Sequence, residues 1–224
     1  MRRTQFVLGA AVCGLLRTAG AAESVTVRVI HADPLTTRVA ILIDGMPTGK
    51  SLALKQSDSF KLSAAQHTLS LTNAETSGAL AVEQTITLAA NHCYTVVVAR
   101  ETTAAGSAVK PLVVPSECKP PEGEKAHATF VLASPSVEKV DVYAGWFKII
   151  SNLKHGEFEG PKAIPAGDYK VVAKDGGKSV LGPIELSPKA GRSYTIVAFD
   201  DSNPADGEQL SHRVYEDVFT STAR

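Results

Sequence analysis

One sequence pattern occurs twice along the chain, and this repeat limits the possible folds more than any other feature. Residues 27–45 (VRVIHADPLTTRVAILIDG) align without a gap with residues 128–146 (ATFVLASPSVEKVDVYAGW), and residues 62–71 parallel residues 164–173. Matching positions include Ala32 with Ala133, Pro34 with Pro135, Val39 with Val140, Ile41 with Val142, and Tyr94-Thr95 with Tyr194-Thr195. A tandem duplication of a module of about 100 residues therefore explains the length of the chain.

Within each copy, apolar and polar residues alternate with a period of two, which is typical of strands with one buried face. Val25, Val27 and Val29, for example, alternate with Thr26 and Arg28. Glycine-containing turn signals separate about seven short strands per copy, and no segment supports a long amphipathic helix. The sequence predicts an all-β protein of two tandem immunoglobulin-like antiparallel β-sandwich domains of about seven strands each.

The domain limits follow from composition. Residues 115–125 (PSECKPPEGEK) are rich in proline and charge, as linkers are. We expect a first sandwich at 23–115, a linker at 116–125 and a second sandwich at 126–224, after a signal peptide at 1–22.

The first 22 residues have the order of a secretory signal peptide. Arg2 and Arg3 precede an apolar stretch at 6–16, which is too short to span a bilayer, and small residues follow at 19–22. The two arginines match the twin-arginine signal only loosely, and Cys13 lacks the small neighbour that a lipoprotein signal needs. We expect cleavage near residue 22 and a periplasmic or secreted protein with no transmembrane segment in the mature chain.

Two cysteines, Cys93 and Cys118, remain in the mature chain. In an oxidising compartment an even count predicts a disulfide. Residues 94–99 and 109–114 are apolar runs around a turn at 104–107, and a hairpin with that turn pairs residues whose numbers sum to about 211. The two cysteine numbers meet this condition, so we expect them to face each other at the open end of the hairpin.

The Ala-x-Pro after the first strand, the Val140-Asp141-Val142-Tyr143 strand, the 165–169 turn and the Tyr-Thr-Val-Val strand resemble a family of secreted bacterial proteins, the domain of unknown function 4397. Two copies of that domain would cover nearly the whole mature chain. The first copy departs from the pattern, with Ala40 in place of an aspartate and Ala64-Ala65-Gln66 in place of Ala-Gly-Asp.

A narrower resemblance concerns the order of segments. The strand at 88–97, the charged linker and residues 174–186 (KDGGKSVLGPIEL) are similar in order and size to the AlgF family, the periplasmic alginate O-acetylation accessory proteins. This resemblance implies a non-enzymatic partner that helps acetyl groups to reach a polysaccharide.

No motif for catalysis, phosphate binding or zinc binding occurs in the sequence. The six histidines are scattered rather than paired at ligand spacing. One acidic segment suits either a surface turn or a calcium loop: Asp200, Asp201, Asn203, Asp206 and Glu208. We favour the turn, and expect no catalytic residue, no cofactor and no metal.

Trp146 and Phe147 are the candidate residues for partner contact. They occupy the tip of an expected hairpin, where the first copy has Gly45 and Met46. Exposed aromatic residues stack on sugar rings or insert into partner proteins. We favour the alternative that they fold back to cap the sandwich or to cover the contact between the domains, because exposed aromatic surface is unfavourable.

The functional expectation is an exported, non-catalytic binding or adaptor protein, with a protein or polysaccharide of the cell envelope as its partner. An accessory role in exopolysaccharide O-acetylation is one form of it, and a structural or adhesive envelope module is the alternative. Nucleic acid is excluded as a partner, because 23 basic and 23 acidic residues are interspersed and give a formal net charge of zero.

Overall fold

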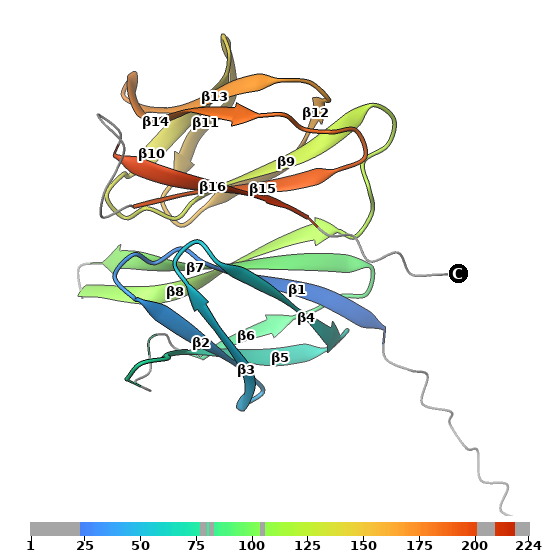
Figure 1. Ribbon diagram of the computed structural model, residues 1–224, viewed down its shortest axis with the longest axis vertical. Helices are drawn as coiled ribbons and strands as arrows, with labels where there is room; N and C mark the ends of the chain where they lie inside the picture. The colour runs from blue at the N-terminus through green and yellow to red at the C-terminus, as the bar shows by residue number, and fades with distance from the viewer. Residues whose placement is uncertain (1–22, 77–79, 81–82, 104–105, 201–208, 218–224) are drawn as a thin grey trace, which may run out of the picture.

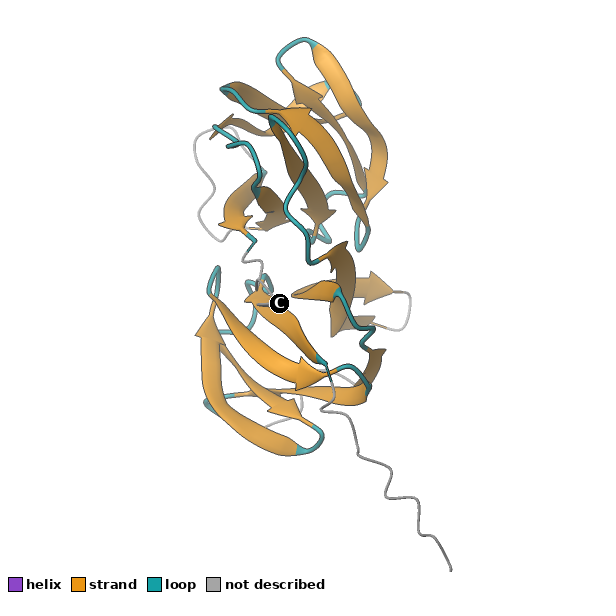
Figure 2. Cartoon of the chain, turned by 90° about the vertical axis from the view of Figure 1, so that its right-hand side faces the viewer, coloured by secondary structure: helices purple, strands orange, loops and turns teal. Residues whose placement is uncertain are grey.

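The computed structural model describes residues 23–76, 80, 83–103, 106–200 and 209–217. The expected signal peptide and the acidic positions 201–208 lie outside these residues. The described part contains sixteen strands and no helix, so it holds no helix that could cross a membrane. Figures 1 and 2 show the strands gathered in two bodies, one for each copy of the repeat.

The two copies contain the same strands in the same order. The first copy comprises β1 (Ser24–His31), β2 (Arg38–Ile43), β3 (Met46–Ala53), β4 (Ser57–Ser63), β5 (Gln66–Asn73), β6 (Gln84–Thr87), β7 (His92–Thr103) and β8 (Gly106–Glu117). The second comprises β9 (Lys125–Leu132), β10 (Lys139–Ala144), β11 (Phe147–Lys154), β12 (Phe158–Pro165), β13 (Tyr169–Asp175), β14 (Lys178–Leu186), β15 (Ser193–Asp200) and β16 (Leu210–Glu216).

Each copy forms a sandwich of two four-stranded sheets. The orders are β4-β1-β7-β8 with β3-β2-β5-β6, and β12-β9-β15-β16 with β11-β10-β13-β14. All neighbours are antiparallel except β1 with β7 and β9 with β15, which are parallel. The sandwich prediction is confirmed, but each copy has eight strands rather than about seven, because β3 and β4 are polar-rich and lack the apolar run that marks a strand.

Each sandwich has its own apolar core. In the first, Val27, Ile41, Leu71 and Val96 are almost fully buried, and in the second, Leu132 and Leu210 are. Tyr94 and Tyr194 lie in these cores, and their hydroxyls accept hydrogen bonds from the Ala89 and Lys189 amides at 2.9 and 3.1 Å. The alternating pattern of the sequence thus corresponds to the inner faces of two separate sandwiches.

A third apolar core joins the two sandwiches. The sheets that contain β1 and β9 face each other, as Figure 1 shows, and we call them the inner sheets and the other two the outer sheets. The residues of this core are Ile30, Ala32, Val97, Ala99, Val114, Val131, Ala133, Val197, Phe199 and Tyr215. Strands β7 and β15 are therefore buried on both faces, which explains their continuous apolar runs.

Arg28 ties the two inner sheets together. Its Nη2 donates hydrogen bonds to Thr95 Oγ1 and Thr195 Oγ1, both at 3.0 Å, and to Asp217 Oδ1 at 2.5 Å. Because Thr95 and Thr195 are equivalent residues of the repeat, the guanidinium lies where the two copies meet symmetrically. Beside it, the Tyr215 hydroxyl donates to the Lys55 carbonyl at 2.9 Å, and burial raises the pKa of Tyr215 to about 12.

A buried ion pair closes the first sandwich at the end of β1. Asp33 is 0% exposed and accepts hydrogen bonds from Arg100 Nε at 2.8 Å, Arg100 Nη2 at 2.7 Å and Thr36 Oγ1 at 2.6 Å. In the second copy the carboxylate stands on the other strand: Asp200 occupies the position of Arg100, and Ser134 occupies that of Asp33. Asp200 accepts hydrogen bonds from Ser134 and Ser136. Asp200 is the last residue of β15 and binds the loop that follows β9, so the choice between a turn and a calcium loop for the acidic segment stays a prediction.

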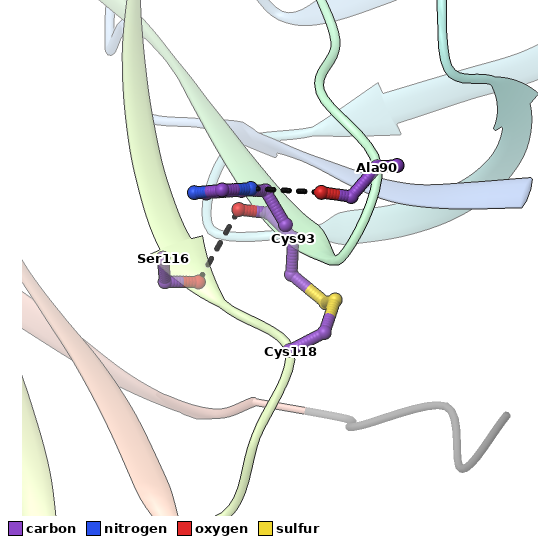
Figure 3. Close-up of a disulfide and its surroundings, with 5 residues drawn as sticks. Ala90, Cys93, Ser116 and Cys118 are labelled. Atoms are coloured by element: carbon purple, nitrogen blue, oxygen red, sulfur yellow. Dashed lines mark hydrogen bonds between the residues drawn. A yellow bond between two sulfur atoms is a disulfide. The ribbon is translucent and has the colours of Figure 1, made fainter. Parts of the chain in front are cut away.

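The structure forms the Cys93–Cys118 disulfide, with 5.1 Å between the two Cα atoms (Figure 3). The expected register is wrong by two, because Thr103 pairs with Gly106 and Cys93 consequently pairs with Ser116. Cys118 reaches Cys93 from beyond the end of β8, which runs to Glu117. β8 continues to Glu117, two residues past the expected end of the first domain at 115. β9 begins at Lys125, one residue before the expected start of the second domain at 126.

Replacing both cysteines with alanine is expected to lower the free energy of unfolding by about 3 kcal/mol, because the disulfide restricts a loop in the unfolded chain. The sequence separation of 25 residues sets the size of that loop. Urea unfolding of the oxidised protein and of the Cys93→Ala/Cys118→Ala variant measures the difference. Equal unfolding midpoints with equal slopes would contradict the expectation.

Candidate functional site

The candidate site is built on the β10–β11 hairpin of the second outer sheet. Ala144 pairs with Phe147, which leaves Gly145 and Trp146 as a two-residue turn. Gly145 has a φ of 57°, the conformation that a type II′ turn requires at its first central position. Turns of this kind match the twist of the flanking strands, so the hairpin holds its tip in a fixed place.

The side chains at this tip are exposed. Trp146 is 96% exposed and Phe147 is 76% exposed. The favoured expectation that they fold back over the sandwich is therefore wrong. The physical reason is that the turn and the last pair of the ladder, Ala144 with Phe147, form the end of the hairpin, where no part of the described chain covers these two side chains.

The corresponding tip of the first copy has different chemistry. Ile43 pairs with Met46 around Asp44 and Gly45, whose φ values of 53° and 74° define a type I′ turn. The Asp44 carboxylate accepts hydrogen bonds from the Thr68 amide at 2.8 Å and from His67 Nδ1 at 2.7 Å. The duplication has thus kept the two-residue turn and changed Asp-Gly into Gly-Trp.

Two histidines of the first copy should titrate on opposite sides of their ordinary pKa of 6.5. Burial lowers the pKa of His31, while the hydrogen bond to Asp44 raises the pKa of His67. Protonated His67 stabilises the folded protein fully below about pH 6.5, and this stabilisation is lost as pH rises through the folded pKa of His67. His31 has the opposite effect: it is buried in its neutral form, so the folded protein becomes less stable as pH drops below about 6.5. NMR titration of the histidine rings measures both, and Asp44→Asn should return His67 toward 6.5. A His67 midpoint at or below 6.5 in the unmodified protein would contradict the assignment.

A tyrosine surrounded by lysines lies next to the exposed tip, on the solvent-facing side of the second outer sheet. Lys174 Nζ and Lys148 Nζ lie over the Tyr143 ring, 4.9 and 5.6 Å from its centroid. Lys148 also pairs with Asp141 at 2.7 Å, and this contact lowers the pKa of Asp141 and raises that of Lys148. The site therefore combines exposed apolar rings with ammonium groups.

A groove of about 790 Å³ lies between the two sandwiches. Two ion pairs lie along it: Arg28 pairs with Asp217 at 2.5 Å, and Lys50 pairs with Asp58 at 3.2 Å. The first pair joins the two inner sheets, and the second joins β3 to β4 within the first sandwich. We therefore assign the groove to the domain interface and the candidate site to the aromatic tip.

Family comparison agrees with the duplicated architecture. The family model described as domain of unknown function (DUF4397) matches residues 25–143 and again residues 126–223. The chain belongs to the DUF4397 family. Because the two matches together span nearly all the described residues, the DUF4397 domain is the repeating unit predicted from the sequence. No curated protein sequence matches this DUF4397 chain, so the resemblance to AlgF stays a prediction.

Solved structures give only remote likenesses to this DUF4397 protein. A family CBM26 module from Eubacterium rectale Amy13K in complex with maltoheptaose has 11% identity and a TM-score of 0.29, with 87% of this chain and 97% of that chain covered. A protein named for cell adhesion from Parabacteroides distasonis has 9% identity and a TM-score of 0.22, with 89% and 100% covered. A second such protein, from Bacteroides eggerthii, has 10% identity and a TM-score of 0.19, with 88% and 96% covered. Scores this low carry no argument about function.

The lysines around Tyr143 are the part of the DUF4397 site that sequence reasoning missed. The signal was present, since Lys139, Asp141 and Tyr143 alternate with buried valines and Lys170 and Lys174 share one face of β13. The zero net charge of the whole chain hid this local excess. Among the described residues, no group of three or more histidines, cysteines or carboxylates is placed to hold a metal ion.

Proposed function

We propose that this protein is an exported, non-catalytic binding module of the cell envelope, and that it contacts its partner through the β10–β11 tip. The observation that carries the proposal is the exposure of Trp146, 96%, on a turn whose conformation is fixed. Large exposed aromatic side chains are unfavourable in water, and tryptophan is among the residues that contribute most to binding when buried in a complex.

The two-sandwich architecture supports this function by holding the tip in place. The tip is the end of a hairpin in an outer sheet, and the third core anchors the second sandwich to the first. A partner therefore meets a rigid surface and loses little conformational entropy on binding. No described residue points to the narrower accessory role in exopolysaccharide O-acetylation, so the proposal stops at binding.

The repeat offers a variant that tests the proposal without disturbing the fold. The tip exchange variant, Gly145→Asp/Trp146→Gly/Phe147→Met, gives the second sandwich the turn that the first sandwich already uses. Co-sedimentation with the insoluble envelope fraction of the source organism measures binding. The variant should bind about tenfold or more weakly than the unmodified protein.

Met46→Ala is the matched control, because Met46 is 70% exposed at the corresponding tip of the first sandwich. This control should bind as the unmodified protein does. Equal binding by the tip exchange variant would refute the proposal. Concentration-dependent self-association that the tip exchange abolishes, with envelope binding intact, would instead favour the structural or adhesive module.

A further inference from the structure

We infer that the partner of the tip is an acidic polysaccharide, which lies along the second outer sheet from Trp146 toward the start of β10. This inference rests on the proposed function and names its ligand class. Its basis is the charge of the solvent-facing side of that sheet, the aromatic rings within it, and the contrast with the first sandwich.

The solvent-facing side of the second outer sheet carries a net positive charge. Strand register and burial place five lysines on it against two carboxylates: Lys139, Lys148, Lys154, Lys170 and Lys174, with Asp141 and Glu185. Asp141 pairs with Lys148 at 2.7 Å, and Glu185 pairs with Lys170 at 3.4 Å. Within the described residues, Lys154 and Lys174 form no ion pair with a carboxylate, and Lys139 acts on Asp141 through its charge without a direct contact, so this side suits an anion.

Aromatic and cationic groups alternate along this surface from the tip inward. Trp146 stands at the tip, and Tyr143 follows, with the ammonium groups of Lys148 and Lys174 over its ring. Phe147 pairs with Ala144, so strand alternation directs its ring to the other face of the hairpin. Sugar rings offer apolar C–H faces that pack on aromatic rings, and sugar carboxylates pair with ammonium groups. A chain of acidic sugars offers both kinds of contact at each residue.

The spread of the lysines favours a flexible polymer over a membrane that meets the tip end-on. Lys139 and Lys154 pair at the far end of the hairpin, five residues along β10 from Ala144. At about 3.3 Å per residue that separation is about 16 Å, longer than the Debye length of about 8 Å at physiological salt. A membrane at the tip would leave these lysines unused, whereas a polymer reaches them.

The position of β10 argues against a peptide that binds over Tyr143 by strand addition, because the edge strands of this sheet are β11 and β14. β10 pairs with β11 on one side and β13 on the other, so its backbone groups are already hydrogen-bonded. A ligand above Tyr143 meets side chains only. Recognition there depends on rings and ammonium groups, the contacts that an acidic polysaccharide uses.

The first sandwich lacks these features at the equivalent positions. Leu42 replaces Tyr143, Ala40 replaces Asp141, and the register of β2 with β5 places Thr68 and Thr72 where the second sandwich has Lys170 and Lys174. The lysine-rich surface is therefore specific to one copy of the duplicated fold. The threonines also supply substitutions that the same sandwich already accommodates.

The test measures binding of the full oxidised chain to four probes: polygalacturonate, neutral dextran, polyglutamate and phosphatidylglycerol vesicles. Polygalacturonate should bind best, and its affinity should fall as salt is raised from about 50 mM to about 200 mM. Lys170→Thr/Lys174→Thr should weaken that binding about fivefold and reduce its salt dependence. The control Lys50→Thr/Lys61→Thr, on exposed lysines of the first sandwich, should change neither.

Three results would overturn the ligand class: no binding to polygalacturonate, equal binding to dextran, or equal or tighter binding to polyglutamate or to the vesicles. The last would identify an acidic protein or an anionic lipid surface instead. If polygalacturonate does not bind but the tip exchange still abolishes envelope co-sedimentation, the ligand class is wrong and the proposed function stands. If the tip exchange leaves co-sedimentation unchanged, the proposed function itself is wrong.

Discussion

Replacing Arg100 with alanine is expected to lower the free energy of unfolding by about 3 kcal/mol, the lower end of the range for breaking a buried ion pair. The Asp33 carboxylate is 0% exposed, so removing its partner leaves a buried charge. Burial alone would raise the pKa of Asp33, but hydrogen bonds from Arg100 and Thr36 outweigh it and hold the pKa below its ordinary value. Urea unfolding near neutral pH, where Asp33 is charged, measures the loss.

Two controls separate the buried charge from the lost side chain. Asp33→Asn should lower the free energy of unfolding less than Arg100→Ala does. The charge that Asp33→Asn leaves without its partner is that of Arg100, whose side chain is 15% exposed and reaches water. The triple variant Asp33→Ser/Leu35→Ser/Arg100→Asp copies the serine and aspartate arrangement of the second sandwich and should be more stable than Arg100→Ala. If Arg100→Ala unfolds at the same urea concentration as the unmodified protein, the ion pair does not stabilise the fold.

Replacing Phe199 with alanine is expected to lower the free energy of unfolding by about 3 to 5 kcal/mol, the usual loss for a buried phenylalanine. Phe199 is 1% exposed and lies in the third core, with Lys55 Nζ of the first sandwich 5.3 Å from its ring centroid. Because that core joins the two sandwiches, the unmodified protein should unfold in one transition and the variant in two. Differential scanning calorimetry distinguishes these outcomes.

Phe147→Ala is the matched control for this prediction, since it removes the same side chain from a position that is 76% exposed. Its effect on the free energy of unfolding should stay within about 0.5 kcal/mol. Two transitions in the unmodified protein would show that the third core does not couple the sandwiches. An unchanged melting temperature in Phe199→Ala would argue that this side chain is not buried between them.

The repeat and its period-two pattern were sufficient to predict two β-sandwiches, because alternation reports directly which face of a strand is buried. They were not sufficient to predict how the sandwiches pack. The structure shows that the continuous apolar runs 94–99 and 194–199 belong to strands buried on both faces, with the domain interface as the second face.

Two local predictions failed for geometric reasons. The hairpin register depended on which residues of the two strands meet first, and the pairing of Thr103 with Gly106 shifted it by two from the expected one. The orientation of Trp146 depended on whether anything lies above the tip, which no local pattern records. The lysine-rich surface was hidden for a similar reason, since its members come from three strands that register alone brings together.

The fluorescence of Trp146 tests the central claim most directly, because the chain contains one tryptophan. In the free protein, the account predicts water-exposed emission that acrylamide quenches fully. On addition of the envelope polysaccharide fraction, the emission should shift to the blue and become protected from acrylamide. Blue-shifted, protected emission in the free protein, or unchanged quenching in the presence of a fraction that co-sediments with the protein, would contradict a binding site at this tip.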